Sequence, residues 1–255
     1  MDRWAGRVAV VTGASAGIGS AIAQDLAKAG MRVVGLARRE DKLQALAEAL
    51  AADGAGELIP VRCDVSDMGD VQRAFQWIDD NVGAVSVLVN NAGVMIAQSI
   101  QDMSNEDMAA VINTNVLGMA SCCREAINSM KKHAVSDGHI VNINSFLGHV
   151  VPVFDDFSVS LYAGSKHAVT AICQGLRCEL KRMHSQGIRI KVTSASPGPV
   201  LTDMFGDDLR SSIPEDEIQR LLKAEDVSRA VCFALASPPN VEMVEITMQA
   251  TGHLT

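Results

Sequence analysis

The sequence predicts an α/β protein built on a doubly wound parallel sheet of about seven strands, with helices on both faces. Three observations lead to this expectation. Short β-branched runs alternate with longer segments whose apolar residues recur at helical spacing, a glycine-rich turn follows the first run, and no linker interrupts the alternation before residue 200. Such alternation favours right-handed crossovers and a mainly parallel sheet.

The elements follow one another regularly along the chain. We expect strands at residues 7–13, 31–37, 57–65, 85–93, 138–145, 188–198 and 241–249. We expect helices at residues 19–30 and 40–53, between the third and fourth strands, and around 104–132 and 160–185. Residues 1–255 are therefore interpreted as one domain.

The segment 202–222 breaks this rhythm, because it is polar and only partly helical in pattern. It can be a solvated surface excursion or a substrate lid spanning 199–225, and the sequence leaves both readings open.

Composition excludes several classes of protein. The chain has 255 residues, 48% of them hydrophobic, and a formal net charge of -8, which disfavours nucleic acid and anionic membranes as partners. No uninterrupted apolar stretch reaches the length of a membrane span. The six cysteines include no C-x-x-C pair and the histidines lack paired metal spacing, so we expect no metal, reduced thiols and a cytoplasmic location.

The turn at 10–19, "VVTGASAGIG", joins the first strand to the first helix. Its glycines allow a tight turn and close approach of a ligand, and the helix N-terminus offers N–H groups and a positive dipole end to a pyrophosphate. This context indicates a Rossmann-type dinucleotide site, although the spacing G-x-x-x-G-x-G departs from the general G-x-G-x-x-G fingerprint. The predicted contacts in this turn are Gly13, Ser15, Ala16, Gly17, Ile18 and Gly19.

The end of the second strand indicates which cofactor is used. An NAD enzyme places a carboxylate there for the ribose 2′-hydroxyl. This chain has Arg38 and Arg39 instead, which suit a 2′-phosphate. We therefore predict NADP(H).

The motifs "TGASAGIG", "NNAG" at 90–93, Ser145 and "YAGSK" at 162–166 occur together in this order. The chain thereby resembles the short-chain dehydrogenase/reductase family from residue 7 to about residue 202. Within the family it is similar to the insect NADP-dependent farnesol dehydrogenase branch and to vertebrate cytosolic relatives that act on 17β-hydroxysteroids and carbonyl compounds.

The resemblance implies roles for matching positions. Asn115 would help to hold a water in a proton relay. The implied cofactor contacts are Asp64 and Val65 at the adenine, Asn91, Ala92 and Gly93 on the cofactor floor, and Pro197, Gly198, Val200 and Thr202 near the nicotinamide.

Tyr162 and Lys166 lie four residues apart and so share one helix face. A nearby ammonium and a positive nicotinamide favour the phenolate, which would bring the pKa of Tyr162 toward the range useful for acid–base catalysis. Lys166 would also bind the nicotinamide ribose. Ser145 ends a strand, where ligands collect in an open α/β sheet, and is preferred over Ser158 and Ser160 as the residue that binds the reacting oxygen.

One departure from the family pattern concerns substrate choice. The stretch between Ser145 and Tyr162 is longer than the dozen or so residues common in the family. Its apolar residues can form a pocket wall or pack on the fold itself.

We expect an NADP(H)-dependent enzyme that interconverts an apolar alcohol, of the farnesol type, with its aldehyde or ketone. A reductase of ketosteroids or small dicarbonyls is the alternative, and a catalytically silent NADPH-binding sensor or scaffold is an alternative of another class. Family resemblance also implies a homodimer or homotetramer formed by the long helices.

Overall fold

The computed structural model describes residues 1–152, 158–202, 204, 218 and 220–252. One sheet of seven strands runs through it in the order β3-β2-β1-β4-β5-β6-β7, and every neighbouring pair is parallel. The strands are β1 (Val8–Thr12), β2 (Arg32–Ala37), β3 (Glu57–Arg62), β4 (Val85–Asn90), β5 (Asp137–Ile143), β6 (Arg189–Pro197) and β7 (Glu245–Met248).

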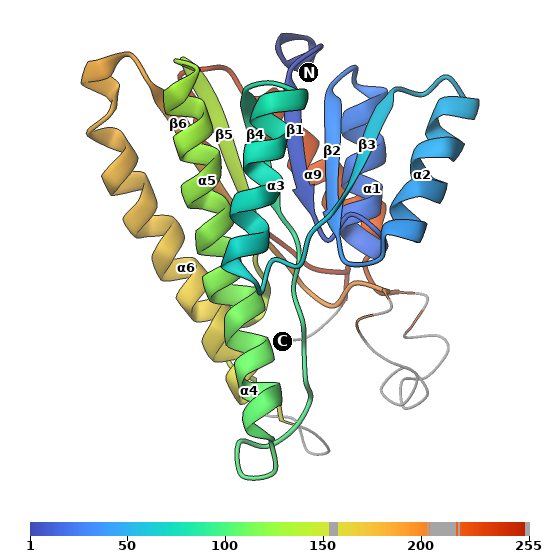
Figure 1. Ribbon diagram of the computed structural model, residues 1–255. Helices are drawn as coiled ribbons and strands as arrows, with labels where there is room; N and C mark the ends of the chain where they lie inside the picture. The colour runs from blue at the N-terminus through green and yellow to red at the C-terminus, as the bar shows by residue number, and fades with distance from the viewer. Residues whose placement is uncertain (153–157, 203, 205–217, 219, 253–255) are drawn as a thin grey trace.

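Helices connect the strands and cover both faces of the sheet (Figure 1). The α-helices are α1 (Gly17–Lys28), α2 (Glu40–Ala52), α3 (Met68–Asn81), α4 (Asn105–Ile112), α5 (Met119–Lys132), α6 (Ser160–Lys181) and α9 (Ala224–Ala236). Short 3-10 helices span Asp2–Trp4, Phe146–Gly148 and His184–Gln186, and a π-helix spans Asn113–Gly118. The predicted fold class is confirmed.

Two hydrophobic cores, one on each face, hold the layers together. In β1, Val8 and Val10 pack with side chains of α3, α5 and α6, whereas Ala9 and Val11 pack with α1, α2 and α9. This alternation follows from the two-residue period of a strand. It explains why the central strands β1 and β4 are buried along their whole length and are not amphipathic.

The sheet order reverses between β1 and β4, because successive strands are added toward β3 on one side and toward β7 on the other. In open parallel sheets, ligands bind outside the carboxyl ends of the strands at such a switch point. The strand arrows in Figure 1 place this edge at the lower end of the molecule.

Two predicted elements differ in extent. The strand predicted at 241–249 forms only over Glu245–Met248, because Val241 N donates to Pro238 O in a turn that delays the strand. The helix predicted around 104–132 is divided into α4, the π-helix and α5. No helix in the described ranges is long and apolar enough to cross a membrane.

The segment considered as a lid lies largely outside the described residues. Its two ends are joined, because Val200 and Leu222 form a β-bridge in which Leu201 N donates to Leu222 O at 2.8 Å. The lid remains a prediction.

Candidate active site

The loop between β1 and α1 is a tight glycine turn. Gly13 and Gly17 have φ values of +67° and +54°, in the left-handed region that favours glycine. A Cβ on Gly19 would lie 2.4 Å from both Asn91 Nδ2 and Gly13 O. The backbone therefore leaves no room for side chains where α1 begins.

The start of α1 offers free backbone donors. Its N-cap residue, Ala16, supplies no side-chain hydrogen bond, so the N–H groups that lack a partner within the helix are free to meet an anion. Ser15 Oγ, beside them, accepts from Arg39 Nη2 at 3.2 Å, while Ile18 packs against the core beneath. The turn fits the pyrophosphate of a dinucleotide.

The loop after β4 is fastened to the glycine turn. Asn91 N and Ala92 N both donate to Thr12 Oγ1 at 3.0 Å, and Asn91 Nδ2 donates to Thr12 O at 3.0 Å. Thr12 was not singled out from the sequence. The sequence signal that could have indicated it is a hydroxyl residue at the end of the strand that leads into the glycine turn.

Arg38 and Arg39 follow β2 at the same edge, and both are exposed. Asp64 follows β3, and its Oδ1 accepts from Ser66 N and Ser66 Oγ at 3.0 and 2.7 Å. Burial pushes the pKa of Asp64 upward, but the bonds from Ser66 and the positive charge of Arg38 outweigh it and lower the pKa. The structure thus brings Arg38 near the expected adenine end of the site.

Val65 lies against the π-helix that carries Asn115, another predicted site residue. A Cβ on Gly118, at the end of the π-helix, would lie 2.5 Å from Val65 O. Only a glycine allows this approach without a shift. The loop predicted to flank the adenine is therefore packed against the helix that carries Asn115.

Asn115 lies in the π-helix and is buried. Its Oδ1 accepts from Val94 N, and its Nδ2 donates to Val94 O and to Ser165 Oγ, at 2.9, 2.9 and 3.0 Å. A Cβ on Gly93 would lie 3.4 Å from Asn115 Oδ1. Asn115 therefore holds the loop that follows "NNAG", and Ser165 is a buried partner that the sequence reasoning missed although it lies inside "YAGSK".

Ser145, Tyr162 and Lys166 lie together at the carboxyl end of β5. Ser145 caps the Phe146–Gly148 turn, and its side chain is hydrogen-bonded to that of Tyr162. Lys166 Nζ donates to Ile143 O at 3.0 Å and lies 5.6 Å from the centre of the Tyr162 ring. All three side chains are buried.

The alternative serines are placed differently. Ser158 Oγ and Ser160 Oγ lie 3.0 Å from each other, and this pair is exposed. The hydrogen bond to Tyr162 comes from Ser145. The geometry therefore favours the serine at the strand end.

Burial dominates the protonation of the tyrosine and the lysine. Burial raises the pKa of Tyr162 to about 12, against a smaller lowering by the hydrogen bond from Ser145. Burial lowers the pKa of Lys166 to about 8. The lowered tyrosine pKa expected from the sequence is therefore not produced by these residues alone, because removal of water penalises the phenolate more than the protein groups stabilise it.

The residues after β6 close the other side of the site. Pro197 is the last residue of β6, and Gly198 N donates to Met248 O at 2.7 Å. Val200 is held in the bridge described above. Thr202 Cγ2 would lie 3.2 Å from a Cβ on Gly17, so this segment reaches the glycine turn.

Apolar side chains surround Tyr162. Phe146, Leu147, Val159 and Ala163 form a buried cluster with it, and Met95 packs against this cluster. Val150 and Val151, which follow the Phe146–Gly148 turn, are 45% and 60% exposed. Residues 153–157 of the lengthened stretch lie outside the described residues.

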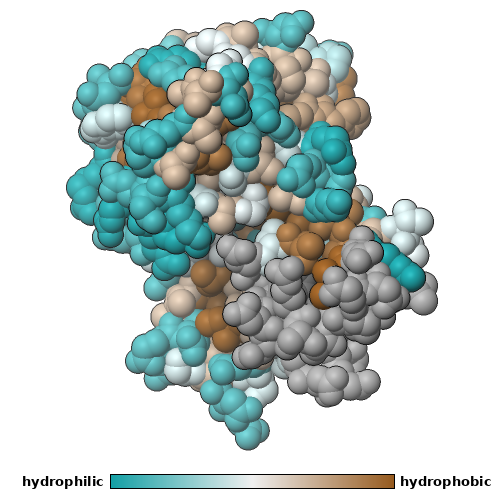
Figure 2. Space-filling view, turned by 90° about the vertical axis from the view of Figure 1, so that its right-hand side faces the viewer, coloured by the Kyte–Doolittle hydropathy of each residue, from teal (hydrophilic) through white to brown (hydrophobic). Residues whose placement is uncertain are grey.

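Figure 2 shows apolar surface in the upper part of the molecule and also in its lower half, at the level of the carboxyl edge of the sheet.

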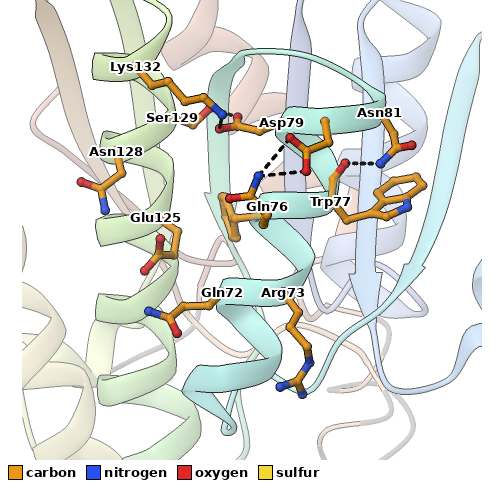
Figure 3. Close-up of a pocket in the computed structure, with 12 residues that line it drawn as sticks. Gln72, Arg73, Gln76, Trp77, Asp79, Asn81, Glu125, Asn128, Ser129 and Lys132 are labelled. Atoms are coloured by element: carbon orange, nitrogen blue, oxygen red, sulfur yellow. Dashed lines mark hydrogen bonds and ion pairs between the residues drawn. The ribbon is translucent and has the colours of Figure 1, made fainter.

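A pocket lies away from this edge of the sheet. It has a volume of about 750 Å³, and Figure 3 shows it between α3 and α5 on one helical face. Gln72, Gln76, Trp77, Glu125 and Asn128 are among its lining residues. It contains none of the residues predicted for catalysis or cofactor binding.

The comparison with protein families gives a direct match. The short chain dehydrogenase family profile matches residues 7–212. The chain belongs to the short-chain dehydrogenase/reductase family of oxidoreductases. The family expected from the four sequence motifs is thereby confirmed.

Individual relatives cover the whole chain. A farnesol dehydrogenase of Aedes aegypti is 48% identical over 99% of each chain. The dehydrogenase/reductase SDR family member 11 of Gallus gallus is 42% identical over the full length of both. A short chain dehydrogenase of Burkholderia cenocepacia, solved in complex with NADP, aligns with a TM-score of 0.80 at 32% identity, over 96% of this chain and 97% of that one.

Proposed function

We propose that the protein is an NADP(H)-dependent oxidoreductase that interconverts an apolar alcohol with its aldehyde or ketone. The observation that carries this proposal is the buried group of Ser145, Tyr162 and Lys166 at the same sheet edge as the glycine turn. When bound, the nicotinamide cofactor would supply or accept the hydride. The protein residues would orient the substrate and manage the proton.

Tyr162 would act as the acid and the base. With a pKa of about 12, its Oη carries a proton at neutral pH and donates it to the oxygen of a carbonyl substrate. In the opposite direction the phenolate takes the hydroxyl proton of an alcohol. Ser145 Oγ would donate to the same substrate oxygen and stabilise the charge that develops there.

Lys166 would lower the free-energy cost of forming the phenolate of Tyr162. Its pKa of about 8 leaves it mostly as an ammonium at neutral pH, close to the Tyr162 ring. This positive charge opposes the cost of ionising a buried tyrosine. Asn115 would help to hold a relay water. Its Nδ2 donates two of the described bonds and its Oδ1 accepts one, so one lone pair of Oδ1 is free.

The cofactor would lie across the carboxyl edge. Arg38 and Arg39 would bind the 2′-phosphate, and this pair of arginines is the basis for choosing NADP(H) over NAD(H). The other proposed contacts are Gly13, Ser15, Ala16, Gly17, Ile18, Gly19, Asp64, Val65, Asn91, Ala92, Gly93, Tyr162, Lys166, Pro197, Gly198, Val200 and Thr202.

The apolar cluster around Tyr162 supports an apolar substrate. A farnesol-type isoprenoid alcohol is the leading candidate, because the mosquito relative is a farnesol dehydrogenase. A carbonyl reductase acting on ketosteroids or small dicarbonyls is the second candidate, since the protonated state of Tyr162 suits donation to a carbonyl.

Two further expectations concern assembly and location. We propose a homodimer or homotetramer formed through α5 and α6. A monomer in sedimentation at micromolar concentration would contradict it. A cytoplasmic location agrees with the free, mostly buried cysteines of the described chain.

Steady-state kinetics test the function. The kcat/KM for farnesol with NADP⁺ should be compared with that for a ketosteroid and a diketone with NADPH. Tyr162→Phe should lower kcat by about 10²- to 10⁴-fold on any accepted substrate, while the Kd for NADPH stays close to that of the wild type. NADPH binding without turnover of any of these substrates would favour the silent sensor or scaffold, and substantial activity of the Phe variant would exclude Tyr162 as the acid and base.

A further inference from the structure

Three polar side chains meet just beyond the Phe146–Gly148 turn. His149 Nε2 lies 3.0 Å from Ser196 Oγ and 3.4 Å from Glu245 Oε1, and Ser196 Oγ donates to Glu245 Oε1 at 2.5 Å. His149 directly follows the turn, Ser196 is near the end of β6 and Glu245 begins β7. The contacts therefore fix the turn to two strands of the sheet.

The direction of these hydrogen bonds follows from the number of protons. Ser196 has one hydroxyl proton and donates it to the carboxylate of Glu245, so its oxygen is free to accept from His149 Nε2–H. Both the imidazolium and the neutral Nε2–H tautomer of His149 can supply this donor. The carboxylate thus orders the chain from His149 through Ser196 to Glu245.

The burial of the group indicates its role. Ser196 is fully buried, whereas the side chains of His149 and Glu245 are 32% and 30% exposed. A buried hydroxyl between two fixed partners cannot reach a substrate from solvent, so Ser196 is not a nucleophile here. The group is suited to hold the backbone in place.

The opposite side of the same turn is held by α6. Thr170 Oγ1 donates to Gly148 O at 2.9 Å, and a Cβ on Gly148 would lie 2.8 Å from Lys166 O. Within the turn, Gly148 N donates to Ser145 O at 2.9 Å. Displacement of the turn away from α6 would therefore move Ser145 relative to Tyr162.

We propose that His149 is a positioning residue, which acts through Ser196 and Glu245 to hold Ser145 against Tyr162 and to fix the base of the segment that begins at Val150. This inference rests on the proposed function, in which Ser145 binds the reacting oxygen. A displacement of about 1 Å in such a group can lower a rate by about 100-fold.

Substitutions of His149 test the proposal. His149→Leu removes the donor and should lower kcat by ~10- to 100-fold, while the Kd for NADPH measured by fluorescence stays unchanged, because the glycine turn is not altered. His149→Gln keeps an N–H donor on a side chain of similar reach and should retain most of the wild-type kcat. Ser196→Ala should resemble His149→Leu, and the double variant should be no worse than either single variant, since the two residues act as a unit.

His133→Leu is the matched control. The side chain of His133 is 31% exposed and lies 3.5 Å from Asp79 Oδ1, so the substitution removes a comparable histidine–carboxylate contact. His133 follows α5, at the end of that helix remote from the carboxyl edge (Figure 1). Its kcat should equal that of the wild type.

Hydrogen exchange provides a measurement that does not depend on activity. The amides of Leu147, Gly148, His149 and Val150 donate to Ser145 Oγ, Ser145 O, Phe146 O and Phe146 O, respectively. In His149→Leu these amides should exchange faster than in the wild type and in the His133→Leu control. Unchanged exchange would overturn the inference.

The two measurements together separate the outcomes. Faster exchange with an unchanged kcat would mean that the contact is only structural, and would overturn the positioning role. Loss of kcat in His149→Gln equal to that in His149→Leu would also contradict a role as hydrogen-bond donor. If the wild type turns over no alcohol or carbonyl, the proposed function fails, whereas exchange still supports or overturns the contribution of His149 to the turn.

Discussion

Asn115 binds the backbone of Val94 through both ends of its side-chain amide. Oδ1 accepts from Val94 N and Nδ2 donates to Val94 O, each at 2.9 Å, and the second proton of Nδ2 goes to Ser165 Oγ at 3.0 Å. The π-helix that carries Asn115 is thus joined to the loop after β4 and to α6. This relationship connects the proposed floor of the cofactor site with the helix that bears Tyr162 and Lys166.

Asn115→Ala should destabilise the protein and slow the reaction. The substitution leaves the half-buried N–H and C=O of Val94 and the buried Ser165 Oγ without these partners, and a buried unsatisfied group costs about 1–3 kcal/mol. The free energy of unfolding from urea titration should fall by that amount. Gln44→Ala, at an exposed position of α2, is the control and should change little; equal stability of the two variants would show that the bonds to Val94 contribute nothing.

The sequence predicted the architecture well because the central strands are buried on both faces. Alternate residues of β1 and β4 enter the two cores, which gives continuous apolar runs that are easy to recognise beside helical patterns. The π-helix was not predicted. Its six residues (Asn113–Gly118) interrupt an otherwise helical pattern. Gly118 packs against Val65 O there, a contact that hydrophobic periodicity does not encode.

The residues of the candidate site were predicted from the sequence, but the effect of burial on their pKa values was not. Ser145, Tyr162 and Lys166 come together as expected. The raised pKa of Tyr162 in the cofactor-free protein was not foreseen, because the degree of burial depends on Phe146, Val159 and other neighbours that only the fold brings together. The roles of Thr12, Ser165 and His149 were missed for the same reason, since each depends on contacts between distant elements.

The two arginines after β2 should determine cofactor preference. Arg38→Ala and Arg39→Ala should each raise the KM for NADPH by ~10- to 100-fold, because a charge-assisted bond to a phosphate is lost. The KM for NADH should change little, since NADH has no 2′-phosphate. Arg229→Ala removes an exposed arginine of α9 and controls for net charge. Equal effects on NADPH and NADH would exclude a 2′-phosphate contact.

Two glycines should respond in opposite directions to the same substitution. Gly19→Ala places a Cβ 2.4 Å from Gly13 O and Asn91 Nδ2, so the turn must shift, at a cost of about 1–3 kcal/mol, and NADPH binding should weaken. Gly175→Ala adds a Cβ with no atom within 4 Å in α6 and should stabilise the protein by about 0.5–1 kcal/mol. Unfolding midpoints and NADPH titrations of both variants measure this contrast. Normal NADPH binding by Gly19→Ala would argue against close approach of the cofactor to this turn.

Lys166 should make stability depend on pH in the cofactor-free protein. Its pKa is about 8 in the folded state against an ordinary value of 10.5, so between these values the unfolded chain binds more protons and stability rises with pH. The contribution is fully present above pH 10.5 and is lost as the pH falls through 8.

The effect can be isolated by comparing the wild type with Lys166→Met at two pH values. Between about pH 7.5 and about pH 9.5, the wild type should gain about 2 kcal/mol in unfolding free energy relative to the variant. Tyr162 acts in a separate window, because its pKa is raised from 10.0 to about 12 and its contribution is lost only as the pH rises through that range. Subtracting the variant removes the titration of the buried thiols, whose pKa values are also raised. Parallel pH profiles of the two proteins would show that Lys166 is not held in a desolvated site.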